Sequence, residues 1–479
     1  MDRTTRIQDY ELENSLLDFY FNSIFSSTNS SNKLFTRKEL MNLMINYERS
    51  YYSNHMCCTG TVSSIDAESL NILNRDSTTY VDIQGLSWND PEQRANIFNK
   101  RSLFFKSYTN FENSIEMSSH NCTRLANSNN EYWYFNKFFI IPNMYLNHFQ
   151  LRNLVAFNEL NEIIYVENKL NQVVGSSDFN VKRLNPINSK QEVIFASNDF
   201  SNDYGDEESL KVSTLNSYKD LVISGLYNGT IIIHNKGSDL TLKHTLTTNP
   251  QAITNFIDIN SQDNELLISS NDGKLRFFSL SVLKTSREID AENPINCLTK
   301  NPLNYNQILL AGDRPESVII DKRSNRDCLE LTGHRDYSFS CDWNPNGYLV
   351  ATGNQDSTVK LYDLRYLSKN KEDDNSLKTL GGKLKGAVRN LKFDLDGNFL
   401  AFGESLDNVY CINLQENELN YQSINFIGKI TGLNFIRNQN NFGQLLSIGI
   451  SDECTGGILQ YAFESSSKVI DLYNDGEFI

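Results

Sequence analysis

The sequence predicts an all-β fold, a seven-bladed β-propeller over residues 146–465, because short apolar strands recur with a regular spacing in the second half of the chain. Residues 347–353 read GYLVATG and residues 397–403 read GNFLAFG, which places a turn glycine, an apolar strand and a second glycine 50 positions apart. An aromatic residue, Trp343 or Phe393, stands four positions before the first glycine in each copy. The two stretches are therefore copies of one structural unit.

Further copies extend the repeat in both directions. Residues 222–235 (VISGLYNGTIIIHN) align without a gap on residues 350–363, which lie 128 positions later, about three repeat lengths. Several antiparallel strands in each unit of about 43 residues are typical of a propeller rather than a helical solenoid. Looser copies and weak strands bring the count to seven: 150–168, 267–280, 308–323 and 445–463.

Turn pairs separate the predicted strands. Asn-Gly and Asp-Gly supply the positive φ that tight hairpins need, because glycine has no Cβ to clash. We therefore expect hairpin turns at Asn228-Gly229, Asp272-Gly273 and Asp396-Gly397.

The clearest copy carries a family resemblance. Gly333-His334 is followed by 27 residues and then by Tyr362-Asp363, a spacing that resembles the WD40 repeat with Tyr in place of the usual Trp. Other segments, among them DIQGLSWNDPEQR (82–94) and HFQLRNLVAF (148–157), resemble fungal and plant WD-repeat proteins of undefined function. This resemblance extends over about residues 82–462. This resemblance supports the fold and implies little about activity.

The resemblance also implies a structural tetrad of His334, Thr352, Asp356 and Tyr362. In WD-repeat blades the His bonds to the turn Asp and to a strand Ser or Thr, which in turn bonds to the aromatic residue of the next strand. Asp, His and Thr superficially resemble a hydrolase triad, but that chemistry needs an exposed nucleophile, an oxyanion hole and a pocket. We expect the network to be buried and structural, and we predict no catalytic residue.

Loops at the strand ends are the expected recognition surface, because a rigid propeller holds them in place. Arg and Tyr are frequent in the centres of protein interfaces. Each side chain could instead be solvated or bonded within its blade. The candidate partner-binding residues of the clearest copy are Arg335, Asp336, Tyr337, Asn354 and Gln355.

Arg365 is a sixth candidate. Tyr362-Asp-Leu-Arg365 resembles the Trp-Asp-x-Arg box by which some WD proteins dock on the adaptor of a cullin ubiquitin ligase. The alternative is that Arg365 pairs within its own blade.

Residues 1–145 differ in character and are expected to form a mainly helical N-terminal extension. Residues 35–54 place apolar residues on one helical face, and Thr36 with Glu39 forms a capping box. Asp90 and Pro91 are typical of the start of a second helix. We expect these helices to pack on the propeller or to close its first blade, and residues 466–479 to be an acidic tail.

Composition narrows the function classes. The net charge of −15 opposes attraction to nucleic-acid phosphates, and no apolar run is long enough to predict a membrane span. The acidic N-terminus lacks a signal-peptide pattern, which predicts a cytoplasmic and/or nuclear protein with reduced cysteines. Cysteine and histidine spacing indicates neither a metal site nor a cofactor, and HExxH and GxSxG motifs do not occur.

These observations predict a non-catalytic protein-interaction scaffold or recognition subunit with protein partners. A sharper alternative is a substrate receptor of a ubiquitin ligase, either cullin-based or resembling the propeller receptors of the glucose-induced degradation ligase. An alternative of another class is an enzyme with its site in the propeller channel. That alternative requires two or more titratable groups with shifted pKa values in one channel pocket.

Overall fold

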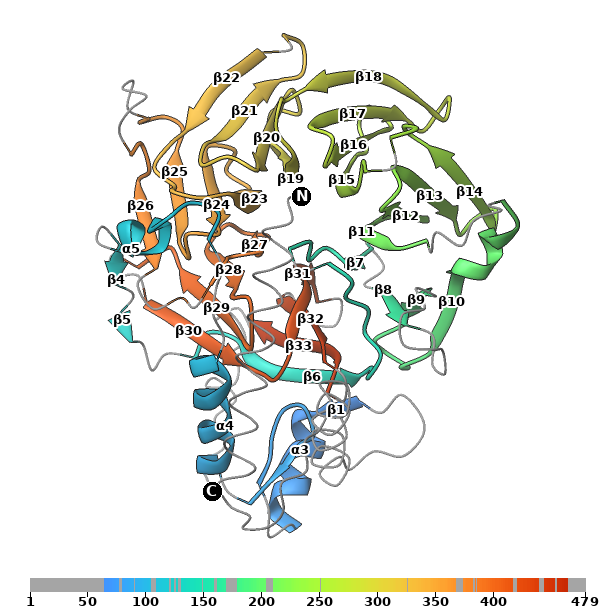
Figure 1. Ribbon diagram of the computed structural model, residues 1–479. Coiled ribbons are helices and arrows are strands. Elements are labelled where there is room, and N and C mark those ends of the chain that lie inside the picture. Colours follow the sequence, from blue (N-terminus) through green and yellow to red (C-terminus); the bar gives the residue numbers. More distant parts are fainter. Residues whose placement is uncertain are drawn as a thin grey trace, which may run out of the picture. The chain divides into compact units, whose positions relative to one another are not determined.

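The computed structural model describes much of the chain between residues 64 and 463 (Figure 1). The chain divides into two compact units, one formed by Met1–Thr61 with Leu70–Lys106 and the other by Val62–Ser69 with Ser107–Ile479. The described ranges are 64–76, 80–89, 91–104, 109–119, 122–124, 126–127, 131–148, 150–158, 162–168, 179–203, 210–249, 251–324, 326–367, 374–381, 384, 386–416, 420–438, 443–452 and 455–463.

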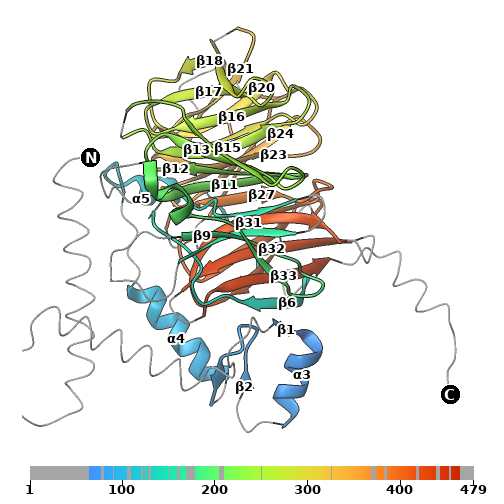
Figure 2. The ribbon, with the colours of Figure 1, turned by 90° about the vertical axis from the view of Figure 1, so that its right-hand side faces the viewer.

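Seven antiparallel sheets of the second unit form a ring, seen face-on in Figure 1 and from the side in Figure 2. The predicted seven-bladed propeller is therefore confirmed. Blades 1 to 4 contain, from the centre outward, β7 (Val155–Phe157), β8 (Ile163–Asn168), β9 (Phe179–Leu184) and β10 (Gln191–Ala196); β11 (Val212–Tyr218), β12 (Leu221–Leu226), β13 (Thr230–Asn235) and β14 (Leu240–Thr245); β15 (Thr254–Asn260), β16 (Glu265–Ser270), β17 (Lys274–Ser279) and β18 (Lys284–Asp290); and β19 (Ile295–Lys300), β20 (Gln307–Gly312), β21 (Ser317–Asp321) and β22 (Arg326–Leu331).

Blades 5 to 7 complete the ring, and segments from upstream add to their outer edges. They contain β23 (Ser338–Trp343), β24 (Leu349–Asn354), β25 (Val359–Asp363) and β26 (Lys378–Gly381); β27 (Asn390–Phe393), β28 (Phe399–Gly403), β29 (Asn408–Asn413) and β30 (Asn420–Asn425); and β31 (Lys429–Arg437), β32 (Gln444–Ser451), β33 (Gly457–Phe463) and β6 (Tyr134–Ile140).

The closing strand β6 comes from residues upstream of 146, where the sequence placed the start of the propeller. It pairs antiparallel with β33 in blade 7, and β1 (Ser64–Asp66) pairs with its free edge. Two further short strands add parallel pairs at the rim, β4 (Thr123–Arg124) on β26 and β5 (Ala126–Asn127) on β30. Residues 123–124, 126–127 and 134–140 thus pair with the outer edges of blades 5, 6 and 7, so the ring contains residues from both sides of the expected boundary.

Neighbouring blades share their cores. Leu361 of blade 5 packs in one buried cluster with Leu391 and Phe402 of blade 6. Ile319 of blade 4 packs in the same way with Trp343 of blade 5. The strands can be almost continuously apolar because both faces of each inner strand are covered.

The recurring glycines have two different causes. Gly347 and Gly397 adopt φ values of +77° and +76°, which confirms that they are equivalent turn residues. The turn glycines of the predicted Asn-Gly and Asp-Gly pairs also have positive φ. The second glycine of each copy is needed for space: a Cβ on Gly353 would lie 2.7 Å from Val388, and one on Gly403 would lie 2.1 Å from Ile430. Both contacted residues belong to the next blade.

The expectation of a mainly helical N-terminal extension is not supported. The described N-terminal residues include β1 to β6 as well as helices, because several short segments pair with propeller strands. The helix expected over 35–54, Asp90 and the tail 466–479 lie outside the described residues. The remaining elements are α3 (Ala67–Asp76), β2 (Tyr80–Val81), β3 (Ser87–Trp88), α4 (Pro91–Phe104), α5 (Ser114–Ser119) and the 3-10 helix η1 (Ser197–Asp203).

The second predicted helix is confirmed, since α4 begins at Pro91 in the first unit. The loop before it is organised by the buried carboxylate of Asp82, which accepts hydrogen bonds from Trp88 Nε1 and Arg94 Nε, both at 2.9 Å. None of the described helices combines the length and apolar character needed to cross a membrane.

Candidate interaction surface on blade 5

The four residues of the predicted tetrad lie together inside blade 5. His334 Nδ1 lies 3.2 Å from Asp356 Oδ2, and His334 Nε2 lies 2.7 Å from Thr352 Oγ1. The Tyr362 hydroxyl donates to the carbonyl oxygen of Thr332 at 3.2 Å. All four tetrad side chains are buried, so the Thr352 hydroxyl cannot meet a substrate as a nucleophile would.

The Asp356 carboxylate is the centre of this network. It also accepts hydrogen bonds from Arg335 N (3.0 Å), Thr358 Oγ1 (2.6 Å) and Ser118 Oγ (2.9 Å). Burial alone would raise the pKa of Asp356, but His334, Thr358 and the backbone N–H of Arg335 hold the pKa below its usual value. A buried carboxylate with its acceptor positions filled fixes the geometry of the blade.

The five predicted loop residues differ in accessibility. Arg335 is exposed and Tyr337 is half-buried, whereas Asp336, Asn354 and Gln355 are buried. The Asn354 amide donates to Ser338 Oγ at 2.9 Å, and its carbonyl accepts from Asp356 N at 2.8 Å. The side chain of Asn354 therefore bonds within the blade.

Asp336 instead bonds to residues 109–119, here called the α5 segment. Its carboxylate accepts hydrogen bonds from Asn110 N (2.9 Å), Asn110 Nδ2 (2.7 Å) and Ser114 Oγ (2.8 Å). Figure 2 shows that α5 lies on one face of the ring. Sequence reasoning missed this contact because more than 220 residues separate its two sides.

Two more contacts hold the α5 segment to the same blade. The Phe111 ring meets the Tyr337 ring edge-on, with 5.6 Å between the centroids. Ser118 Oγ donates to Asp356 at 2.9 Å, which connects the segment to the tetrad. Two of the predicted recognition residues are thus in contact with the protein's own chain.

Arg365 pairs within its blade. Its guanidinium lies 2.6 Å from the Asp363 carboxylate and 3.6 Å from the centroid of the Tyr348 ring. The side chain is half exposed, so its outer part remains accessible to solvent.

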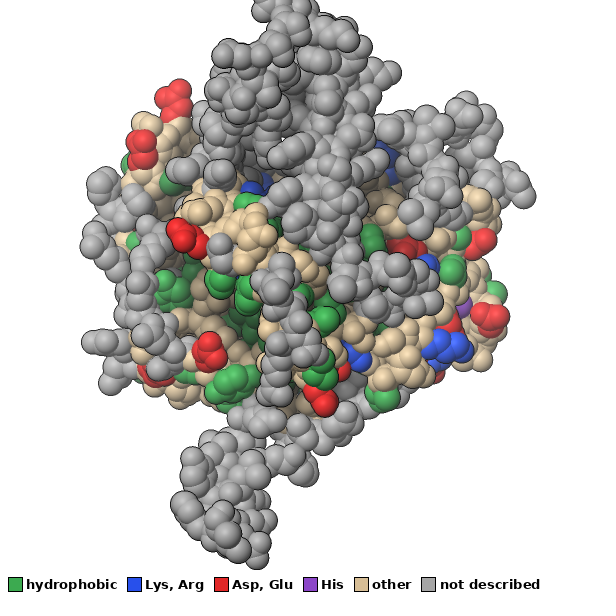
Figure 3. All heavy atoms as spheres, turned by 90° about the horizontal axis from the view of Figure 1, so that it is seen from below, with side chains coloured by type: hydrophobic (Ala, Val, Ile, Leu, Met, Phe, Trp, Pro, Cys, Tyr) green, Lys and Arg blue, Asp and Glu red, His purple; other side chains and the backbone are tan. Residues whose placement is uncertain are grey.

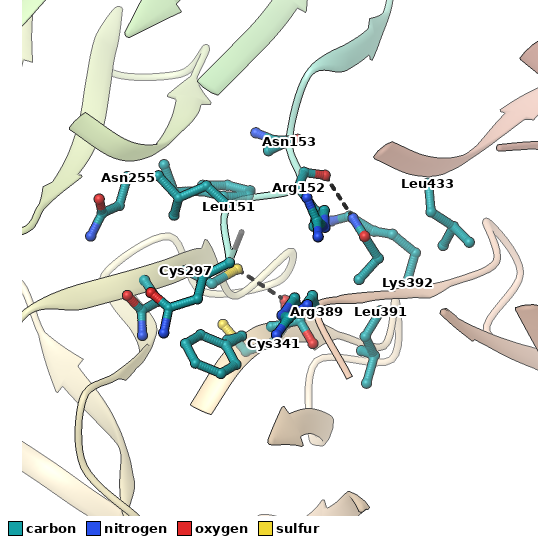
Figure 4. Close-up of a pocket in the computed structure, with 16 residues that line it drawn as sticks. Leu151, Arg152, Asn153, Asn255, Cys297, Cys341, Arg389, Leu391, Lys392 and Leu433 are labelled. Carbon is teal, nitrogen blue, oxygen red and sulfur yellow. Dashed lines mark hydrogen bonds between the residues drawn. The ribbon is translucent and has the colours of Figure 1, made fainter. Parts of the chain in front are cut away.

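The propeller channel contains a small cavity of about 40 Å³, shown in Figure 4. A buried water needs about 10–15 Å³ on this measure, so the cavity has room for a few water molecules. Its wall includes Arg152, Cys341, Arg389 and Lys392, contributed by the innermost strands and the residues that flank them.

Two titratable groups in this wall have shifted pKa values, as the enzyme alternative requires. Burial raises the pKa of Cys341 far above that of a reactive thiolate. Burial would lower the pKa of Lys392, but the Asp342 carboxylate 2.8 Å away raises it above its usual value. Both groups keep their protons at neutral pH, so neither shift favours proton transfer there. Within the described ranges, no three His, Cys, Asp or Glu residues are grouped so that they could hold a metal ion.

Polar side chains at the channel connect successive blades, a role that the sequence analysis did not assign. Each donates to a backbone carbonyl of another blade or of the segment that enters it, and for all but Asn390 that is the next blade. The available signal was an asparagine or serine near the start of six of the seven innermost strands. The pairs are Asn153 to Leu215, Ser213 to Thr254, Asn255 to Ile295, Asn296 to Ser338, Ser340 to Val388, and Asn390 to Arg152, at 2.6–3.2 Å.

Every blade exposes a large apolar side chain at the same end of the ring. The α5 segment contacts the loop between β22 and β23, whereas these side chains lie in or beside turns at the opposite strand ends. Among the described residues they are Ile187, Leu240, Val282, Leu303, Tyr366, Leu395 and Tyr134, in blades 1 to 7 respectively, and they are here called the apolar ring.

Comparison with known proteins finds a WD-repeat likeness in blade 5. The family model described as "WD domain, G-beta repeat" matches residues 326–363. The U3 small nucleolar RNA-associated protein 21 of Saccharomyces cerevisiae is 24% identical over 193 residues, which cover 39% of this chain and 19% of that protein. A chain in the crystal structure of the mitotic checkpoint complex superposes with a TM-score of 0.54 at 16% identity, covering 70% of this chain and 96% of that chain. This last likeness concerns the fold alone.

Proposed function

We propose that this chain, a seven-bladed β-propeller whose residues 326–363 match a WD-repeat family model, is a non-catalytic protein-interaction scaffold or recognition subunit. The observation that carries the proposal is the apolar ring, to which every blade contributes. Large apolar side chains that are exposed gain free energy when a protein partner covers them. The shared cores keep these side chains in fixed relative positions, as a recognition surface requires.

The negative net charge favours a protein partner over a nucleic-acid partner. The net charge is −15, and nucleic-acid binding requires clustered Lys and Arg. On the face in view in Figure 3, acidic and basic side chains are scattered among uncharged atoms. We propose that the protein meets its partners in the cytoplasm or the nucleus.

Affinity purification of tagged full-length protein tests the function. Val282→Lys, Leu303→Lys and Tyr366→Lys together place three charges on the apolar ring. We expect this variant to lose a partner that the unchanged protein captures under native conditions. The control is Val193→Lys, since Val193 is exposed on the outer strand β10.

The control variant should retain the partner. Equal capture by all three proteins, each with an unchanged melting temperature, would show that the apolar ring does not bind it. Loss of the partner from the control as well would indicate a general charge effect.

No contact among the described residues favours the ubiquitin ligase alternative. Arg365 is already paired with Asp363 and stacked on Tyr348. The alternative stays a prediction, and purification without any ligase subunit under native conditions would count against it.

A further inference from the structure

The α5 segment covers two residues that the sequence marked for recognition. Asp336 is fully buried, and its carboxylate accepts hydrogen bonds from the backbone N–H and the side-chain Nδ2 of Asn110 and from the hydroxyl of Ser114. Phe111 N adds a longer contact at 3.4 Å. From its own blade, the carboxylate accepts a hydrogen bond from Tyr337 N at 2.8 Å. The α5 segment therefore supplies most of the partners that this buried charge needs.

Side chains hold the α5 segment in place. Its bonds to blade 5 come from positions 110, 114 and 118, which are four residues apart and so lie on one side of a helical turn. None of the described strand pairings includes residues 109–119. Phe111 and Met117 remain 43% and 54% exposed, so the segment buries little apolar surface. Such an element opens at a lower cost in free energy than a core strand does.

Departure of the segment would affect its two carboxylates differently. Asp356 would lose Ser118 but keep His334, Arg335 N and Thr358, so the tetrad would remain bonded. Asp336 would lose its donors from the α5 segment, and Tyr337 would lose its ring contact with Phe111. The blade can therefore persist while the recognition residues become available.

We propose that Asp336 and Tyr337 form a docking site for a short turn of a protein partner, and that the α5 segment occupies this site as an internal competitor. The contacts define the partner motif. It contains an Asn whose backbone N–H and side-chain amide donate to the carboxylate. An aromatic residue follows directly, and a Ser stands four positions after the Asn. This inference rests on the proposed recognition function and adds the chemistry of one partner motif. Binding requires the α5 segment to leave.

The test uses the full chain with Asn110→Ala and Ser114→Ala, which remove two side-chain donors from the α5 segment. The probe is a fluorescein-labelled peptide of residues 109–119, TNFENSIEMSS. We expect this release variant to bind the probe at least about tenfold more tightly than the unchanged protein, in fluorescence polarisation. A peptide carrying the same two alanines is the matched probe control and should bind neither protein.

A third protein adds Asp336→Asn to the release variant and should bind the probe about tenfold more weakly, because the charged acceptor is gone. Absence of saturable binding to a folded release variant would overturn the proposal. Equal binding with and without Asp336→Asn would overturn it too.

Hydrogen exchange of the unchanged protein gives a second readout that does not depend on the variants. Amides of residues 110–119 should exchange faster than those of β24 and β25. Equal protection would show that the segment is a permanent part of the fold. Such a result would leave the partner capture through the apolar ring untouched, so the two proposals can fail separately.

Discussion

Asp356 is the residue on which the tetrad depends, because it accepts bonds from His334, Arg335 N, Thr358 and Ser118. Asp356→Ala would leave these buried donors without an acceptor. We expect the free energy of unfolding to fall by about 1–3 kcal/mol, measured by urea denaturation. Arg335→Ala is the control, since its side chain is exposed and its backbone N–H remains. An unchanged unfolding midpoint for Asp356→Ala would rule out a stabilising tetrad.

His148 predicts a pH dependence of stability. Its Nδ1 accepts hydrogen bonds from Gln150 N and Leu151 N, both at 3.1 Å, and protonation there would break them. Burial, with Arg152 and Arg389 nearby, lowers the pKa of His148 from 6.5 to about 4.

Because this folded-state pKa lies below the unfolded value, the unfolded chain binds the proton first as the pH falls. Stability should therefore drop between about pH 6.5 and 4 and lose nothing more from this group below that range. We expect the free energy of unfolding to fall by about 1–3 kcal/mol over this range, a value that already allows for the partial exposure of the His148 ring.

His148→Asn keeps an acceptor oxygen and does not titrate. Urea denaturation at pH 7 and pH 5 should show a smaller loss of stability for this variant than for the unchanged protein. Equal losses for both proteins would exclude His148 as the cause.

At the scale of the element, the packing of one blade on the next limits which side chains a strand can carry. Gly353 lies on β24, where an added Cβ would meet Ser340 Oγ at 2.4 Å and Val388 at 2.7 Å. We expect Gly353→Ala to destabilise the protein by about 1–3 kcal/mol in thermal or urea unfolding, because the core must shift to accept it.

Gly237→Ala is the matched control. Its nearest neighbour would be Asn235 Oδ1 at 3.3 Å, and its φ is not in the left-handed region. This variant should stay within about 0.5 kcal/mol of the unchanged protein. Equal effects at both glycines would contradict the packing argument.

The sequence predicted the elements whose signals are local. Turn glycines and apolar strands are visible within one repeat, and the spacing from His334 to Tyr362 indicated one blade and its polar network. The outer strand β6 was missed, because its seven residues become a propeller strand only through pairing with β33. The burial of Asp336 was missed for the same reason, since its cover lies far upstream. Pairing across such separations leaves no local pattern.

At the scale of the whole molecule, the propeller depends on closure. Its buried clusters span two blades, so an incomplete ring would expose half of a core. The bonds around the channel connect blades 1 to 6 in order, and Asn390 of blade 6 then donates to the carbonyl of Arg152, which precedes blade 1. Blade 7 is closed by β6, which joins the two ends of the propeller in one sheet. The described fold therefore requires a segment that the repeats themselves do not contain.

Truncation tests this requirement. A chain of residues 146–479 lacks β6, which leaves the outer edge of β33 unpaired and removes Phe138 and Phe139, both fully buried. Burial of one such side chain contributes about 1.5–3 kcal/mol, so the loss approaches the total stability of an ordinary domain.

A chain of residues 131–479 keeps β6 and also Trp133, whose backbone N–H bonds to Gln422 at 2.8 Å. We expect the longer chain to be monomeric with a cooperative thermal transition, and the shorter chain to aggregate or to melt without cooperativity, as judged by size-exclusion chromatography and calorimetry. Equal melting temperatures for the two chains would show that the ring closes without β6.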